Sequence, residues 1–243
     1  MRQPSGTPTL IPEQIAVSCK MLSDRIHERF PDRGIDRHAH WFADYARHAV
    51  ATGKSSIEAP VFLRLISWLG GMAAVLLLLS PVYFVRRVDG LDHLVTFLTS
   101  LDAFITLLAA TIAGFFTMRS IELGVVRSRA LAGLHTLRSF AHVTDMLQIT
   151  KCPTRLLFPH APTKSSPHEE DDAMSMSRYL SYCTELYALT AKVAVLYGEW
   201  TSDPTVLSAL DDVENLCSSL ENRITQKILL LEQLNQRVRT TTE

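Results

Sequence analysis

The apolar positions of the first sixty residues follow a helical period. Five of them are separated by steps of four, three, four and four, which places them on one face of a helix: Ile15, Cys19, Leu22, Ile26 and Phe30. The motif FPDRG, with Pro31 and Gly34, interrupts this pattern, and a second helix is predicted from about residue 36 to 51. Residues 1–12 are predicted to be a flexible leader, and residues 13–64 a pair of N-terminal cytoplasmic helices.

Two uncharged stretches follow. Residues 65–85 include twenty-one positions without a charge, and residues 103–118 include sixteen. A helix of twenty-one residues is about 31 Å long, which is enough to cross a bilayer. The pattern therefore predicts a transmembrane hairpin over residues 65–118, with spans at about 65–85 and 99–118.

Basic residues around the two spans predict the orientation of this hairpin. The flanks carry seven of them and the connecting loop only Arg86 and Arg87. Because Lys and Arg are enriched on the cytoplasmic side, both termini are expected in the cytoplasm. Contact with anionic lipid headgroups is expected for Arg119, Arg127 and Arg129, which come just after the second span.

Small residues in both spans predict close helix packing. Gly70 and Ala74 lie four apart in the first span, as do Ala110 and Gly114 in the second. Asp102 lies about 5 Å inside the outer edge of the second span. It is expected to form an ion pair with Arg86 or Arg87 that fixes the register of the hairpin, which we call the hairpin clamp.

The remaining chain, residues 119–243, predicts a cytoplasmic helical bundle. Helical patterning continues from the second span to about residue 150, and residues 151–172 contain four prolines and an acidic cluster that indicate a loop. A further helix is predicted over about 173–198. The last helix begins at Pro204 after Asp203, a residue type favoured at the N-cap.

The last helix has an apolar seam that alternates steps of four and three, interrupted by Lys227. Such a seam requires a partner helix. Packing inside the bundle and a coiled coil between subunits both satisfy it, so self-association through this helix remains open.

Composition limits the classes of function. The net charge of -1 gives no basic footprint for nucleic acid. Four cysteines without CxxC spacing indicate neither a zinc site nor a disulfide framework. His38 and His40 lie two apart and do not share a helix face, so no cofactor or metal is expected.

The best candidate for a functional site is a set of four polar residues on the predicted helix after the second span. At 100° per residue, four side chains fall within about an 80° arc beside an apolar stripe: His135, Arg138, His142 and Asp145. They are expected to face other helices or a cleft. One interpretation is an interhelical polar network with Glu185 or Lys192 as partner, and the other is a ligand site that titrates near neutral pH.

Several segments resemble an uncharacterised family of bacterial membrane proteins. The segments are ERFPDRG, ALAGLHTLRSFAHVTDMLQITKCP, RYLSYCTELYALTAKVAVLY and ITQKILLLEQ. The resemblance implies two spans, a helical cytoplasmic part and a bacterial inner membrane. It implies no activity, ligand or catalytic residue.

The resulting hypothesis is an all-α, membrane-anchored interaction or sensor module that binds a protein partner or a ligand and is not an enzyme. An oligomeric ion channel or membrane-disrupting effector is the first alternative, with Thr106, Thr117 and Asp102 as a thin polar stripe. A metal-dependent hydrolase centred on His135, His142 and Asp145 is the second.

Overall fold

The computed structural model describes residues 10–58, 61–62, 65–66, 68–72, 75–76, 93–153, 164 and 172–242. All regular secondary structure in these residues is helical, as the sequence predicts. The elements are α1 (Pro12–Arg29), α2 (Gly34–Thr52), the short 3₁₀ helix η1 (Gly53–Ser56), α4 (His93–Gln148), α6 (Ala173–Trp200) and α7 (Pro204–Thr242).

The chain divides into two compact units. One, which we call the helical unit, contains residues 1–56 and 130–243. It thus groups the N-terminal helices with the C-terminal part of α4 and with α6 and α7. The other contains residues 57–129. Helix α4 contributes residues to both units.

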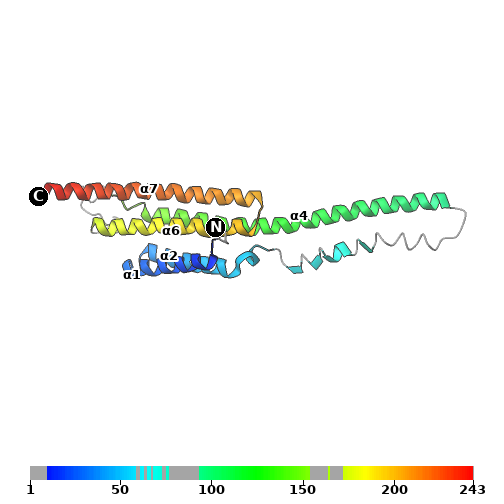
Figure 1. Cartoon of the computed structure of the whole chain (residues 1–243), viewed down its shortest axis with the longest axis horizontal. Coiled ribbons are helices and arrows are strands. Elements are labelled where there is room, and N and C mark those ends of the chain that lie inside the picture. The colour runs from blue at the N-terminus through cyan, green and yellow to red at the C-terminus, as the bar shows by residue number, and fades with distance from the viewer. Residues whose placement is uncertain are drawn as a thin grey trace, which may run out of the picture. The chain divides into compact units, whose positions relative to one another are not determined.

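In the helical unit, α1 and α2 lie side by side, as do α6 and α7 (Figure 1). The apolar stripe predicted for α1 is confirmed, because all five of its residues are buried. The chain turns between α1 and α2 at Asp32, which has a positive φ of 60°. The Asp36 carboxylate supports this turn: it accepts the Asp32 N–H at 3.0 Å and lies 3.1 Å from Nδ1 of His27.

The predicted cap and seam of the last helix are confirmed. The Asp203 carboxylate accepts the Thr205 backbone N–H at 2.9 Å and so satisfies one free donor at the start of α7. Asp172 does the same for α6 through the Ser175 N–H, at 2.7 Å. The α7 residues that pack into the interior are Val206, Leu210, Val213, Cys217, Leu220, Ile224 and Leu231.

One close approach ties α4 to α2 and α6. The Tyr45 hydroxyl donates to the Gly133 carbonyl at 3.2 Å and lies 2.9 Å from the Tyr197 hydroxyl. A Cβ atom at Gly133 would lie 2.4 Å from the Tyr197 ring. The ring therefore packs directly on the α4 backbone, which requires glycine at this position.

Gly133→Ala is expected to lower the free energy of unfolding by about 1–3 kcal/mol, the usual range for overpacking. In a solvent-exposed helix, Gly→Ala raises the free energy of unfolding by about 0.5–1 kcal/mol. A decrease for Gly133→Ala would therefore show the contact with Tyr197. Urea titration of the full-length protein in detergent, followed by circular dichroism, measures it. Gly198→Ala is the control, since its Cβ would meet only the ends of flexible side chains, the Leu210 methyl at 2.7 Å and the Leu207 methyl at 3.5 Å. In a Tyr197→Leu background Gly133→Ala should be neutral or stabilising, and a persistent loss there would contradict the contact.

The other unit exposes apolar side chains. Trp68 is 81% exposed and Phe116 66% exposed, and many aliphatic side chains between residues 61 and 123 are exposed as well. Within the described part of the chain, one helix is long and apolar enough to cross a membrane, Leu101–Gln148. Its most apolar window has a mean hydropathy of 1.8, and none of that window is buried. The first predicted span, 65–85, lies mostly outside the described residues.

Helix α4 begins earlier than the second predicted span. That span was expected from about residue 99, but α4 already begins at His93. No charged residue lies between His93 and Leu101, and only Gly90 and Pro81 nearby oppose helix formation, so nothing in the sequence stops the helix from starting early. The predicted continuation of this helix past residue 119 is confirmed.

Candidate functional site

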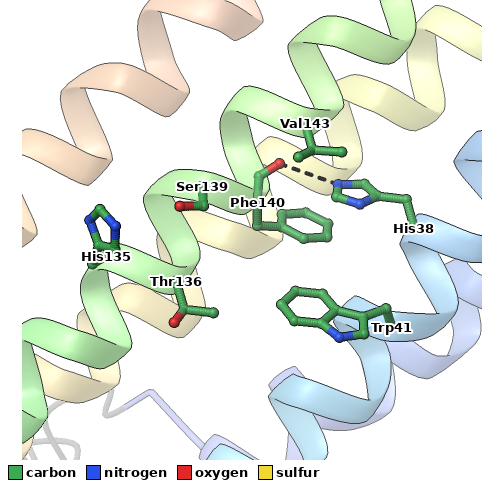
Figure 2. A pocket seen from close by; sticks show the side chains of 7 residues that line it. All are labelled: His38, Trp41, His135, Thr136, Ser139, Phe140 and Val143. Atoms are coloured by element: carbon green, nitrogen blue, oxygen red, sulfur yellow. Dashed lines mark hydrogen bonds between the residues drawn. The ribbon is translucent and has the colours of Figure 1, made fainter.

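An open hollow of about 330 Å³ lies between α2 and the C-terminal part of α4, within the helical unit. Figure 2 shows Trp41 and His38 reaching it from α2, and the remaining lining from successive turns of α4. The α4 residues that line it are His135, Thr136, Ser139, Phe140 and Val143. Their spacing of three and four explains why they share one side of the helix.

Aromatic rings form most of this hollow. Phe140 is buried and stacks on His38, with ring centroids 3.9 Å apart and planes 7° from parallel. Trp41 lies 6.1 Å from Phe140 and 5.7 Å from Tyr45, at 12° and 17°. The Trp41 side chain is nonetheless 51% exposed. The result is a set of nearly parallel rings with one open side.

His38 holds α2 against α4 through hydrogen bonds. Its Nε2 lies 2.9 Å from the Thr144 hydroxyl oxygen and 3.2 Å from the Phe140 carbonyl oxygen. A carbonyl oxygen only accepts, so the proton of the neutral ring belongs on Nε2. Burial lowers the pKa of His38 to about 4, against the smaller opposing effect of the Phe140 carbonyl. The imidazole is therefore neutral near pH 7.

The polar groups at the rim are available to a ligand. Thr136 donates its hydroxyl to the Ala132 carbonyl at 3.0 Å, within α4. Among the described residues, no hydrogen bond engages the Trp41 indole N–H, the Ser139 hydroxyl or the His135 ring. The part of the chain that the structure describes contributes no carboxylate, lysine or arginine to the lining of the hollow.

The four residues predicted as one polar site on α4 do not form one. His135, Arg138 and His142 are exposed, and only Asp145 is half-buried. The expectation was that all four face other helices or a cleft. His135 borders the hollow and Asp145 contacts α7, whereas Arg138 and His142 are exposed. The buried side of α4 is centred near Leu137 and Gln148. It includes Phe140 and Thr144, which contact His38 of α2. The polar arc lies beside that side, and Asp145 is at its edge.

The four residues contribute to different places. His135 lines the hollow with His38. Asp145 accepts from Arg223 on α7 at 3.3 Å and from the Gln148 amide at 2.6 Å. Among the described residues, the interhelical partner of Asp145 is Arg223 rather than the expected Glu185 or Lys192. Glu185 instead accepts from Arg25 of α1 at 2.5 Å.

Lys227, which interrupts the apolar seam of α7, has a structural role at the end of α4. Its ammonium donates to the Gln148 backbone carbonyl at 3.3 Å and to the Gln148 side-chain oxygen at 2.5 Å. Burial lowers the pKa of Lys227. A cation is favourable here because the carbonyls at a helix C-terminus carry partial negative charge.

A second hollow of about 500 Å³ lies on the α1–α2 side of Trp41. It contains three carboxylates, but each is engaged: Asp24 by Lys20, Asp44 by Arg47 and Asp36 by His27. The Asp36 hydrogen bond and charge raise the pKa of His27. Within the described residues, no group of three or more His, Cys, Asp or Glu side chains is placed to hold a metal ion.

The other predicted site residues have varied outcomes. Arg119, Arg127 and Arg129 are exposed; Arg119 pairs with Glu122 at 3.0 Å and Arg129 donates to the Glu58 carbonyl at 2.6 Å. Lipid contact by these residues stays a prediction.

The packing and clamp predictions also stay open. Gly70, Ala110 and Gly114 are exposed, and a Cβ at either glycine would meet no described atom within 4 Å. The side chain of Ala74 lies outside the described residues. Asp102 is exposed, and its expected partners Arg86 and Arg87 lie outside the described residues.

Comparisons with known proteins add no function. No family model, no curated protein and no solved structure matches this chain. The resemblance to two-span bacterial membrane proteins is therefore still a prediction, and the α2–α4 hollow is a candidate site on its geometry alone.

Proposed function

We propose that this chain is a membrane-anchored helical interaction or sensor module of a bacterial inner membrane, with both termini in the cytoplasm. One observation carries the proposal. The most apolar window of the helix Leu101–Gln148 has a mean hydropathy of 1.8, and no part of it is buried by the rest of the chain. In water such a surface would drive association, whereas hydrocarbon stabilises it.

Two further features support an anchor with a hairpin. Described residues between 61 and 76 are helical, and exposed apolar side chains there include Phe62, Leu65, Trp68 and Leu76. The helical unit has in contrast a buried core and an open hollow. An anchor joined to a folded unit with a binding site suits detection of a ligand or partner at the membrane.

The alternative of an ion channel has weaker support. A pore would need polar side chains directed into a lumen. The second predicted span offers only a thin stripe of such residues, Asp102, Thr106 and Thr117. Potassium flux through liposomes containing the purified protein tests this alternative, and selective flux would replace the sensor proposal.

Membrane insertion and topology provide the direct test of the proposal. The chain should remain in the membrane pellet after an alkaline carbonate wash. In intact spheroplasts, a membrane-impermeant maleimide should label Gly90→Cys in the predicted outer loop and leave the wild-type cysteines unlabelled. A C-terminal tag should be cleaved by protease in inverted vesicles and protected in spheroplasts. Release into the wash, or labelling of wild-type protein, would overturn the proposal.

A further inference from the structure

We propose that the α2–α4 hollow binds a small, planar, uncharged heteroaromatic molecule whose ring lies parallel to those of Trp41 and Phe140. The inference rests on the proposed sensor function and names the class of ligand that the site would detect. Three properties of the hollow carry it: its size, the orientation of its rings and the chemistry of its rim.

The size indicates a small ligand. A volume of about 330 Å³ is near the lower end of the range for small-molecule sites, roughly 300–1,000 Å³. The hollow opens to solvent between two helices, so a ligand enters without separation of α2 from α4. A folded peptide helix would extend beyond its seven lining residues.

The orientation of the rings favours a planar ligand. His38, Phe140, Trp41 and Tyr45 have ring planes within 17° of parallel in each adjacent pair. Aromatic rings prefer offset stacking at centroid separations of about 4.5–7 Å, so a flat molecule continues this arrangement. The Trp41 side chain lines the hollow and is 51% exposed, so part of its indole surface is open to a ligand there.

The rim favours an uncharged molecule with ring heteroatoms. The Trp41 N–H is a donor, and the Ser139 hydroxyl and the His135 ring both donate and accept. None of these groups has a hydrogen-bond partner among the described residues. A charged ligand would find no opposite charge among the described lining residues, which include no Asp, Glu, Lys or Arg.

Quinoxaline, which is planar, uncharged and has two ring acceptors, is the probe. The matched probe is 1-decalone, which is uncharged, bicyclic and has an acceptor but is not flat. Binding to full-length protein in lipid nanodiscs is measured by saturation-transfer NMR titration, with empty nanodiscs subtracted. We expect quinoxaline to saturate with a Kd of about 10 µM to 1 mM, and 1-decalone to bind at least about fivefold more weakly.

Two variants on α4 localise the binding. Val143→Trp fills the hollow and should weaken quinoxaline binding at least about tenfold. Met146→Trp is the matched control: it lies nearly one turn further along the same helix, is 63% exposed and does not line the hollow. Its affinity should stay within about twofold of wild type. Circular dichroism confirms that both variants are folded.

Several results would overturn the inference. They are absence of saturable binding, equal binding of 1-decalone, or wild-type affinity in folded Val143→Trp. Specific photocrosslinking of a protein to p-benzoylphenylalanine at position 143 in cells would show a protein-docking surface instead. Failure here leaves carbonate resistance and topology unchanged, so it is distinguishable from failure of the membrane proposal.

Discussion

Replacing Phe140 by alanine is expected to lower the free energy of unfolding of the helical unit by about 3–5 kcal/mol, the range for a buried phenylalanine. Phe140 is 2% exposed, and its ring stacks on His38 at 3.9 Å and on Phe42 at 4.3 Å. Removal of the ring leaves a cavity between α2 and α4 and takes away the surface against which Trp41 is held. Urea titration of the full-length protein in detergent, monitored by circular dichroism, measures the loss.

The same helix offers a matched control. Phe116 also lies on α4, but it is 66% exposed and belongs to the other unit. Phe116→Ala should change the free energy of unfolding of the helical unit by about 0.5 kcal/mol or less. It should instead weaken retention in the membrane during the carbonate wash. An equal loss of stability in both variants would contradict the division of α4 into a packed part and an unburied apolar part.

Local signals in the sequence predicted the helices well. The stripe from Ile15 to Phe30 required only the helical period, and the start of α7 required only Asp203 before Pro204. Both features depend on interactions between residues close together in the chain, so the sequence alone is enough to predict them. The single helix from the second predicted span into the bundle also followed from uninterrupted periodicity.

The candidate site was less accessible from the sequence. The spacing of the four polar residues showed that they share one side of α4. Whether that side is buried or exposed depends on which helices pack against α4. His38 illustrates the difference. Its spacing from His40 showed that the two rings face different directions, and nothing local showed that His38 meets Thr144, 106 residues away. Contacts over such separations are set by the packing of the whole bundle.

The close approach of Tyr197 to Gly133 was missed for the same reason. A glycine within a strong helical pattern is a recognisable signal, because glycine weakens a helix unless something requires it. The sequence alone did not say which side chain occupies the space. The structure assigns it to Tyr197 and adds Tyr45 as the hydrogen-bond partner.

Acidification from pH 7 to pH 5 should destabilise the helical unit by about 2 kcal/mol through His38 alone. The pKa of His38 is about 4 in the folded protein, because burial disfavours the charged ring, and 6.5 is its ordinary value. The unfolded chain therefore binds the proton first. The contribution of the neutral His38 ring to the free energy of unfolding is complete above about pH 6.5 and is lost as the pH falls toward 4. His27 acts in the opposite direction, since Asp36 raises its pKa.

His38→Gln separates this effect from other titrations. The glutamine amide is able to donate to the Thr144 hydroxyl but does not titrate, so the loss between pH 7 and pH 5 should shrink by about 2 kcal/mol relative to wild type. Leu134→Val is the control. It removes a methylene from the buried side of α4, the helix against which His38 packs. It should cost about 0.5–1.5 kcal/mol and keep the wild-type difference between the two pH values. An unchanged pH dependence in His38→Gln would mean that the ring is not held neutral between α2 and α4. The geometry of the hollow would then differ from that described, because the stacked, neutral His38 ring positions Phe140 at its base.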